Sequence, residues 1–106
     1  MVKRIRTAED HNDTGLQVAP LPARYTRYTF ADFVAGAKTH NLIEDTPLVW
    51  IMLTSDENEL LLPTVEGDGT WRLPSGMIWP ISALGRRDVS MTLSATADAT
   101  VEIWEF

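Results

Sequence analysis

The chain is built from short apolar or alternating runs that are separated by polar turns. In the clearest run, Val89, Met91 and Leu93 alternate with serine and threonine, which is the pattern of a strand with one face on a core and one in solvent. By contrast, residues 48–53 are all apolar, which predicts a strand buried in the middle of a sandwich. Runs of these kinds predict strands at residues 24–30, 48–53, 59–65, 70–73, 77–84, 89–95 and 99–106.

Turn signals divide these runs at intervals of about 8 to 12 residues, a spacing typical of β-sandwiches. The strongest signals contain Gly, Pro, Asn or Asp and lie at residues 55–58, 66–69 and 74–76. We expect two successive hairpins, one joining residues 48–53 to 59–65 and one joining 59–65 to 70–73. Seven or eight short strands indicate an all-β fold, an antiparallel β-sandwich or jelly roll.

Residues 30–39 follow a different pattern. Apolar side chains recur at helical spacing from Phe30 to Ala37, and Thr29 is a suitable N-terminal cap. Gly36 weakens a helix here, because glycine is less favourable than alanine by about 1 kcal/mol in a helix interior. We therefore expect either one short helix or a bulged loop in this segment.

The first 22 residues show no sustained period and end on Pro20 and Pro22. Proline favours extended backbone and has no N–H to donate to a sheet. We therefore expect residues 1–22 to form an extended arm and residues 23–106 to form one sandwich domain. Fully extended, such an arm spans roughly 70 Å at about 3.3 Å per residue.

Length and composition agree with one small folded domain. The 106 residues are 44% hydrophobic, and a chain of this size buries roughly 65% of its unfolded surface on folding. No apolar run reaches the roughly 18 to 20 residues that span a bilayer, and polar residues follow the basic start where a signal peptide would be apolar. We expect a soluble protein with no membrane partner and no export signal.

Charge is distributed unevenly along the chain. The net charge is −6, with five Lys or Arg against three Asp or Glu in residues 1–30 and four against twelve in residues 31–106. A weakly basic stretch of 30 residues, which includes the arm, therefore precedes an acidic body. Nucleic-acid binding requires a basic surface for phosphate contacts, so we expect no nucleic-acid partner.

The residues give no catalytic or metal-binding pattern. The chain has no cysteine and two histidines, His11 in the arm and His40 in an expected loop. A nucleophilic triad needs a base placed beside a serine or cysteine, and neither histidine lies in such a motif. The acidic clusters at residues 9–13 and 56–59 do not match a calcium loop. We expect neither an enzyme nor a cofactor, and interpret both clusters as solvated.

Four tryptophans are many for a chain of this size. Trp50 and Trp79 lie in apolar runs, so we expect them in the core. Trp71 and Trp104 lie beside polar residues, where a half-exposed tryptophan often anchors a protein interface. Plain core packing and a carbohydrate-binding platform are the competing interpretations of this second pair.

The last predicted strand is apolar on both of its faces. Val101 and Ile103 are expected to share the core face, which turns Trp104 and Phe106 toward the opposite surface. The first predicted strand carries tyrosines and arginines within residues 24–28, the residue types of a stacking platform for single-stranded nucleic acid or sugar. The acidic body favours ordinary strand packing for these side chains.

A block of turn and strand motifs occupies residues 73–84 (LPSGMIWPISAL) and 94–106 (SATADATVEIWEF). A Leu-Pro-x-Gly turn leads into a strand with a central proline, and a turn of small residues leads into a final aromatic strand. In this block the sequence resembles small accessory virion proteins of tailed bacteriophages, namely head-decoration or cement proteins and spike-base proteins. The resemblance covers about a third of the chain.

The resemblance implies a β-sandwich that attaches to a capsid or tail surface, often as a symmetric oligomer, without catalysis or a cofactor. The expected partners are the major capsid protein or neighbouring virion subunits and further copies of this chain, as a trimer or dimer, in a virion assembled in the host cytoplasm. The basic residues of the arm would pair with an acidic surface and its apolar residues would fill grooves. The expected interface residues are Lys3, Arg4, Arg6, Leu16, Val18, Leu21, Trp71, Trp104 and Phe106.

Three other functions compete with shell decoration. A tail, baseplate or spike-base component keeps the fold but changes the copy number and symmetry. A soluble carbohydrate-binding module requires Trp71 and Trp104 to form one exposed platform. A small cupin-like enzyme requires clustered metal ligands inside the barrel, and residues 41–106 contain no histidine.

Overall fold

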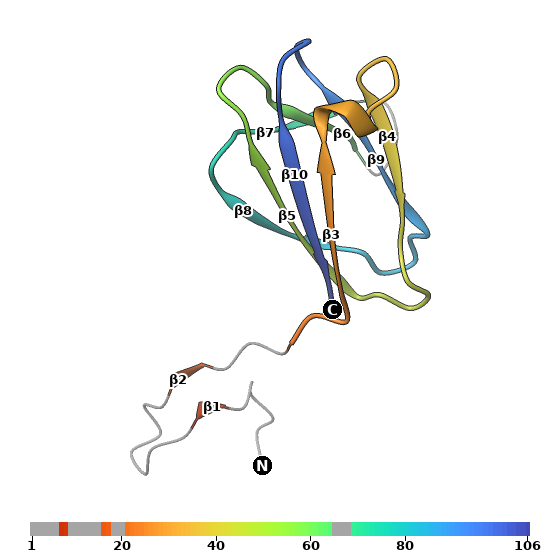
Figure 1. Cartoon of the computed structure of the whole chain (residues 1–106). Helices are drawn as coiled ribbons and strands as arrows, with labels where there is room; N and C mark the ends of the chain where they lie inside the picture. Colours follow the sequence, from red (N-terminus) through yellow and green to blue (C-terminus); the bar gives the residue numbers. More distant parts are fainter. Residues whose placement is uncertain (1–6, 9–15, 18–20, 65–68) are drawn as a thin grey trace.

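A computed structural model describes residues 7–8, 16–17, 21–64 and 69–106 of the chain. Its main body consists of two four-stranded antiparallel sheets that stack face to face (Figure 1). The expected β-sandwich of seven or eight strands is therefore confirmed. Within the described residues, the one helical element is a three-residue 3₁₀ turn.

Each sheet combines strands from distant parts of the sequence. In spatial order, the first sheet contains β3 (Arg24–Thr29), β10 (Thr100–Glu105), β5 (Leu48–Thr54) and β8 (Ile78–Ser82). The second sheet contains β4 (Ala37–Asn41), β9 (Asp88–Leu93), β6 (Leu60–Pro63) and β7 (Thr70–Leu73).

The strands pair as one long hairpin that is rolled up on itself. β6 pairs with β7, β5 with β8, β4 with β9 and β3 with β10, so each pair encloses the previous one along the chain. This nested order of eight strands in two sheets is a jelly roll. The hairpin of β6 and β7 is confirmed. The expected hairpin of β5 and β6 is wrong, because residues 55–59 carry the chain from the first sheet to the second.

The core lies between the two sheets and follows the alternation of the strands. In β5, Val49, Ile51 and Leu53 are buried, and Val101 and Ile103 of the neighbouring β10 are buried beside them. Each fully buried aliphatic side chain contributes about 1.5–3 kcal/mol relative to its exposed state. The other core residues are Phe33, Leu60, Leu62, Leu73, Ala83, Met91, Leu93 and Ala99.

The short helix expected within residues 30–39 is one 3₁₀ turn, η1 (Phe30–Asp32). Its Asp32 carboxylate accepts a hydrogen bond of 2.8 Å from the backbone N–H of Thr29, the residue expected to cap it. A side chain that reaches back three residues in this way is one half of a capping box. The helical spacing of the following apolar residues does not extend the helix.

A tight turn and an additional strand occupy the rest of this segment. Ala35 and Gly36 have φ values of 53° and 78°, and Val34 and Ala37 exchange backbone hydrogen bonds of 2.9 and 3.0 Å across them. Positive φ at both central residues of a two-residue loop is the type I′ hairpin turn. The turn leads into β4, which was not predicted because its residues are mostly polar and do not alternate with apolar ones.

The N-terminal segment contributes two short strands, β1 (Thr7–Ala8) and β2 (Leu16–Gln17). They pair antiparallel, with Thr7 opposite Gln17 and Ala8 opposite Leu16. They form a sheet of their own, which belongs to neither layer of the sandwich and is drawn below it in Figure 1.

The two open sides of the sandwich are closed differently. On one side β3 faces β4, and the Tyr28 hydroxyl lies 2.7 Å from Nδ1 of His40. On the other side β8 faces β7, and the rings of Trp71 and Trp79 pack edge to face with centroids 5.8 Å apart. Pro80 lies in the middle of β8, an edge strand, which is where sheets tolerate proline.

Candidate interaction surfaces

The outer face of the first sheet carries a row of ring-bearing side chains. Cross-strand register places Tyr25 opposite Trp104, Trp104 opposite Trp50, and Trp50 opposite Pro80. Directly opposed residues project from the same face of a sheet, so the four rings cross all four strands in one line. We call these four residues the outer row.

Further apolar side chains surround the outer row. Phe106 packs on Trp50 with ring centroids 4.8 Å apart, and Tyr25 packs on Trp104 at 5.5 Å. Tyr25 is 48% exposed, and the other three rings are partly exposed. The outward face of an antiparallel sheet is normally polar, so this row of apolar side chains makes the face a candidate binding surface. The remaining apolar members are Leu48, Met52 and Ile78.

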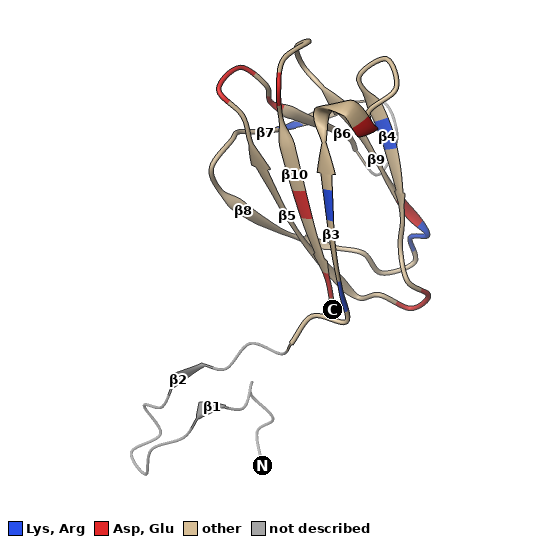
Figure 2. Cartoon of the chain, in the orientation of Figure 1, with Lys and Arg blue, Asp and Glu red and all other residues tan. Residues whose placement is uncertain are grey.

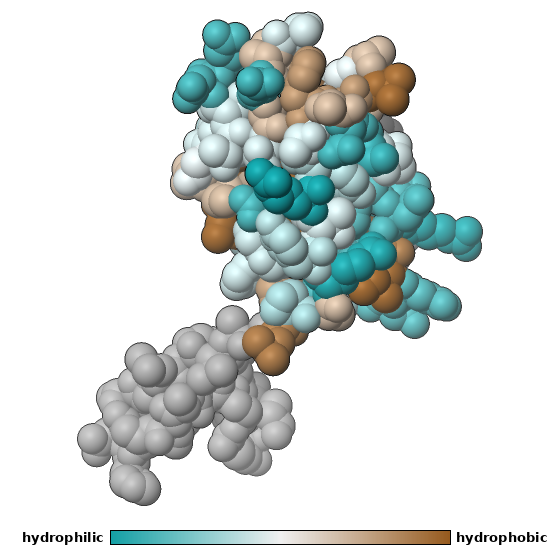
Figure 3. Space-filling view, in the orientation of Figure 1, coloured by the Kyte–Doolittle hydropathy of each residue, from teal (hydrophilic) through white to brown (hydrophobic). Residues whose placement is uncertain are grey.

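Two opposite charges lie next to the outer row. Arg27 of β3 is opposite Glu102 of β10, and Figure 2 shows a basic and an acidic position side by side on these strands. The Tyr25 hydroxyl donates a hydrogen bond of 2.8 Å to Glu102 Oε2, which raises the pKa of Tyr25. β5 and β8 contain no charged residue. In Figure 3 the strongly hydrophilic atoms in the middle of this face form a small patch with paler atoms around it.

The structure corrects the interpretation of Trp50. Trp50 alternates with the buried Val49 and Ile51 and therefore lies on the outer face, not in the core. Trp79 was also expected in the core, and it does pack against the core from the inner side of β8. β5 is apolar on both faces because one face meets the core and the other belongs to the exposed surface.

The structure separates Trp71 from Trp104. Trp71 lies on β7, an edge strand of the second sheet, and is 40% exposed. It lines a cleft of about 300 Å³ between the two sheets, together with Leu62, Ile81 and Val89. Trp104 lies on the outer face of the first sheet, so these two tryptophans do not form the single platform expected of a carbohydrate-binding module.

The expected interface residues of the arm are only partly described. Leu16 belongs to β2, and Leu21, which precedes the sandwich, is 92% exposed. Those outside the described residues are Lys3, Arg4, Arg6 and Val18.

A polar network closes the side of the sandwich between β3 and β4. Glu105 of β10 is fully buried, and its Oε1 accepts hydrogen bonds from Arg24 Nη2 at 2.9 Å and from the backbone N–H of Ile43 at 3.2 Å. Arg24 Nε donates to the second carboxylate oxygen. His40 Nε2 lies 3.1 Å from Glu105 Oε1, and its Nδ1 faces the Tyr28 hydroxyl. His40 was expected in an exposed loop and is instead buried in β4.

The partners determine the protonation of this network. An ionised carboxylate only accepts hydrogen bonds, so Nε2 of His40 carries the proton and Nδ1 accepts from Tyr28. Burial lowers the pKa of His40 more than the Glu105 carboxylate raises it, which keeps the ring neutral near pH 7. Burial alone would raise the pKa of Glu105, but the hydrogen bonds from Arg24 and Ile43, together with His40, hold it below its usual value.

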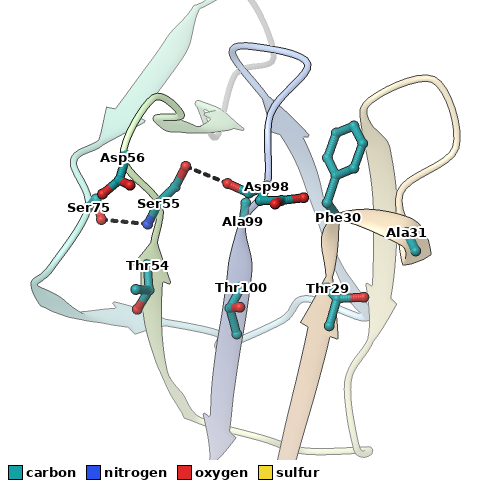
Figure 4. A pocket seen from close by; sticks show the side chains of 10 residues that line it. All are labelled: Thr29, Phe30, Ala31, Thr54, Ser55, Asp56, Ser75, Asp98, Ala99 and Thr100. Carbon is teal, nitrogen blue, oxygen red and sulfur yellow. Dashed lines mark hydrogen bonds between the residues drawn. The ribbon is translucent and has the colours of Figure 1, made fainter.

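One end of the sandwich carries a shallow polar pocket of about 550 Å³ (Figure 4). Ser55 connects two of its walls, since its backbone N–H donates to Ser75 Oγ at 2.8 Å and its own Oγ donates to the Asp98 carbonyl at 2.8 Å. The lining includes the carboxylates of Asp56 and Asp98 and no histidine or cysteine. No group of three His, Cys, Asp or Glu within the described ranges could hold a metal ion, and we assign no chemistry to this pocket.

Comparison with known proteins gives no relative on which a function could be based. No protein-family model, no curated protein and no solved structure matches the chain significantly. In the part of the chain that the structure describes, no helix has the length and apolarity of a membrane span. The surfaces described above are therefore the basis for assigning a function.

Proposed function

We propose that this protein is a structural accessory protein of a tailed-phage virion, a decoration or cement protein that binds the capsid shell. The observation that carries the proposal is an N-terminal segment outside both sheets of a jelly roll. β1 and β2 pair with each other, and Leu21, which follows them, is 92% exposed. Because this strand pair belongs to neither sheet of the sandwich, it is available for contact with a neighbouring subunit.

The fold and the charge distribution support the same proposal. Jelly rolls are common in viral capsid proteins, although a fold by itself does not determine a function. Lys3, Arg4 and Arg6 make the start of the arm basic, whereas the body is acidic. This favours attachment of residues 3–6 to an acidic surface. On a repeating lattice, many individually weak attachments reinforce one another.

In this proposal the arm makes the principal contact with the major capsid protein or a neighbouring virion subunit. Leu16, Val18 and Leu21 fill apolar grooves of that partner, and the basic residues pair with its carboxylates. The protein acts without catalysis or a cofactor, in a virion assembled in the host cytoplasm.

The copy number in purified particles tests the location. Calibrated mass spectrometry gives the amount of this chain relative to the major shell protein. An amount comparable with that of the shell protein supports shell decoration. A far smaller amount, as expected for a single tail, places the chain in the tail or spike. Its absence from particles overturns the virion function.

Removal of residues 1–22 tests the arm. The sandwich should stay folded, because all eight of its strands lie between Arg24 and Glu105. Rebinding to particles that lack the protein should be lost. A matched variant in which Lys3, Arg4 and Arg6 are changed to Glu should bind more weakly at low salt, and its deficit should shrink at high salt. Unchanged rebinding of the truncated chain contradicts the arm model.

A further inference from the structure

We propose that the outer row is a binding site for a single chain of neutral oligosaccharide. Tyr25, Trp104, Trp50 and Pro80 stand side by side on the four strands of the first sheet. Strands lie about 4.8 Å apart, so the row is about 14 Å long, which suits a short run of linked sugar rings. The site does not involve the arm and does not depend on the virion function.

The rings of the outer row suit a sugar because their apolar faces are held in place. One face of a pyranose ring presents C–H groups, which pack on aromatic faces, while its hydroxyls remain at the rim. Trp50 is supported by Phe106 at 4.8 Å and Trp104 by Tyr25 at 5.5 Å. Rings that are fixed by packing lose little conformational entropy when a ligand stacks on them.

The geometry of the rings also indicates the form of the ligand. The ring planes of Tyr25 and Trp104 are inclined by 44°, which makes the platform twisted and not flat. The right-handed twist of about 20 to 25° between neighbouring strands adds a further rotation along the row. A single flexible oligosaccharide can follow this twist, whereas the flat surface of a crystalline polysaccharide cannot.

Polar groups beside the outer row supply the partners that sugar hydroxyls need. Arg27 offers several N–H donors, and the carboxylate of Glu102 accepts hydrogen bonds. Glu102 is oriented by the Tyr25 hydroxyl at 2.8 Å. The two charges cancel, so the face suits an uncharged ligand. An anionic polymer would be repelled by a chain of net charge −6.

The size of the face favours a small ligand over a second copy of the chain. Across the sheet, the outer row extends over three strand spacings, or about 14 Å. Along the strands, the apolar face extends over four residues, which is also about 14 Å. With the width of a side chain added in both directions, the area of the face is roughly 400 Å². A stable protein interface buries about 800 Å² on each partner. The face is too small for such an interface but large enough for a few sugar rings.

Calorimetric titration of the full-length chain with neutral tetrasaccharides tests the site. The panel contains α-linked and β-linked glucose and β-linked N-acetylglucosamine oligomers, with tryptophan fluorescence as the second readout. At least one member should bind. Trp104→Ala should weaken that binding by about tenfold or more, because a stacking ring is lost. Trp71→Ala is the matched control, since it removes an exposed tryptophan from the other sheet, and it should leave the affinity unchanged.

Tyr25→Ala keeps the test decisive if Trp104→Ala does not fold. Tyr25 is 48% exposed, so its removal spares the core and should still weaken binding. The proposal is overturned if the wild-type chain binds no member of the panel, or if Trp71→Ala loses as much affinity as Trp104→Ala. If the wild-type chain binds no sugar and Trp104→Ala abolishes self-association or particle binding, the outer row is a protein interface and the proposal is overturned. Absence of the chain from virions would refute the proposed function without affecting this result.

Discussion

Glu105 in β10 and His40 in β4 meet between the two sheets, with Oε1 and Nε2 3.1 Å apart and side chains that are 0% and 3% exposed. Glu105 occupies an inward position of its strand, in line with the buried Val101 and Ile103. A charge therefore lies where the strand pattern calls for an apolar residue. Arg24, which is 42% exposed, joins this buried carboxylate to the surface.

Replacing Glu105 with alanine should destabilise the fold strongly. The change leaves the guanidinium of Arg24 and the N–H groups of His40 and Ile43 without their common acceptor, and removal of one member of a buried charged pair costs about 3 kcal/mol or more. Equilibrium unfolding in urea measures this loss. The control is Glu59→Ala, which breaks the pair of Arg72 and Glu59 at 3.1 Å, where the side chains are 59% and 46% exposed. It should cost less than about 1 kcal/mol, and equal losses would contradict the role of the network.

Acidification should destabilise the protein in two steps. The pKa of His40 is lowered in the folded chain, so the unfolded chain takes up this proton first, and stability begins to fall below about pH 6.5. The pKa of Glu105 is also lowered. Its contribution is complete above the unfolded value of about 4.3 and is lost as the pH falls through the folded value.

Thermal unfolding midpoints measured from neutral to acidic pH test whether stability falls on acidification. The midpoint should fall on acidification, first through protonation of His40 and then through protonation of Glu105. In His40→Gln the first step should disappear while the second remains. A midpoint that rises as the pH falls would show that these two groups do not control the stability.

Much of the fold is encoded locally and could be predicted from the sequence. The alternation in residues 89–95 predicted the strand observed as β9, in which Met91 and Leu93 are buried. β4 was missed because its buried side chain, His40, is polar. His40 is satisfied by Tyr28 and Glu105, which lie 12 and 65 residues away in the sequence, and no local pattern reveals such partners.

The candidate surface could be predicted only where the alternation of a strand shows which of its faces meets the core. Trp104 and Phe106 were expected on the face opposite Val101. The register of β10 places Trp104 there, and Phe106 packs on Trp50 of the same face. Trp50 lies in a run that is apolar on both faces, so the sequence gives no sign of which face meets the core. Its position beside Trp104 follows from the pairing of β5 with β10, which is set by packing between distant segments.

Ala35→Asn should stabilise the protein. Ala35 has a φ of 53°, and the left-handed region costs an ordinary L-residue about 1 kcal/mol. Asparagine is favoured at the first central position of a type I′ turn, so the free energy of unfolding should rise by about 0.5 kcal/mol or more. Urea denaturation measures the change.

Gly36→Ala is the companion variant, with the opposite expected sign. Gly36 has a φ of 78°, so alanine there should lower the free energy of unfolding by about 1 kcal/mol. If Ala35→Asn destabilises the protein or Gly36→Ala does not, the turn is not of type I′.

Pro80→Thr should increase self-association through the edge of the first sheet. Pro80 lies opposite Trp50 in the β5–β8 pair. Because proline has no N–H to donate to Trp50, it suits a non-hydrogen-bonded position of this pair. At such a position its nitrogen faces the free edge of the sheet. There it removes a donor that an incoming strand would use, which is how edge strands resist unwanted pairing. Light scattering after size-exclusion chromatography at increasing concentration should show larger species for Pro80→Thr. The control is Ser82→Thr, which adds a similar residue to β8 without adding an N–H and should behave like the wild-type chain. Identical behaviour of all three proteins would mean that another feature of β8 protects the edge.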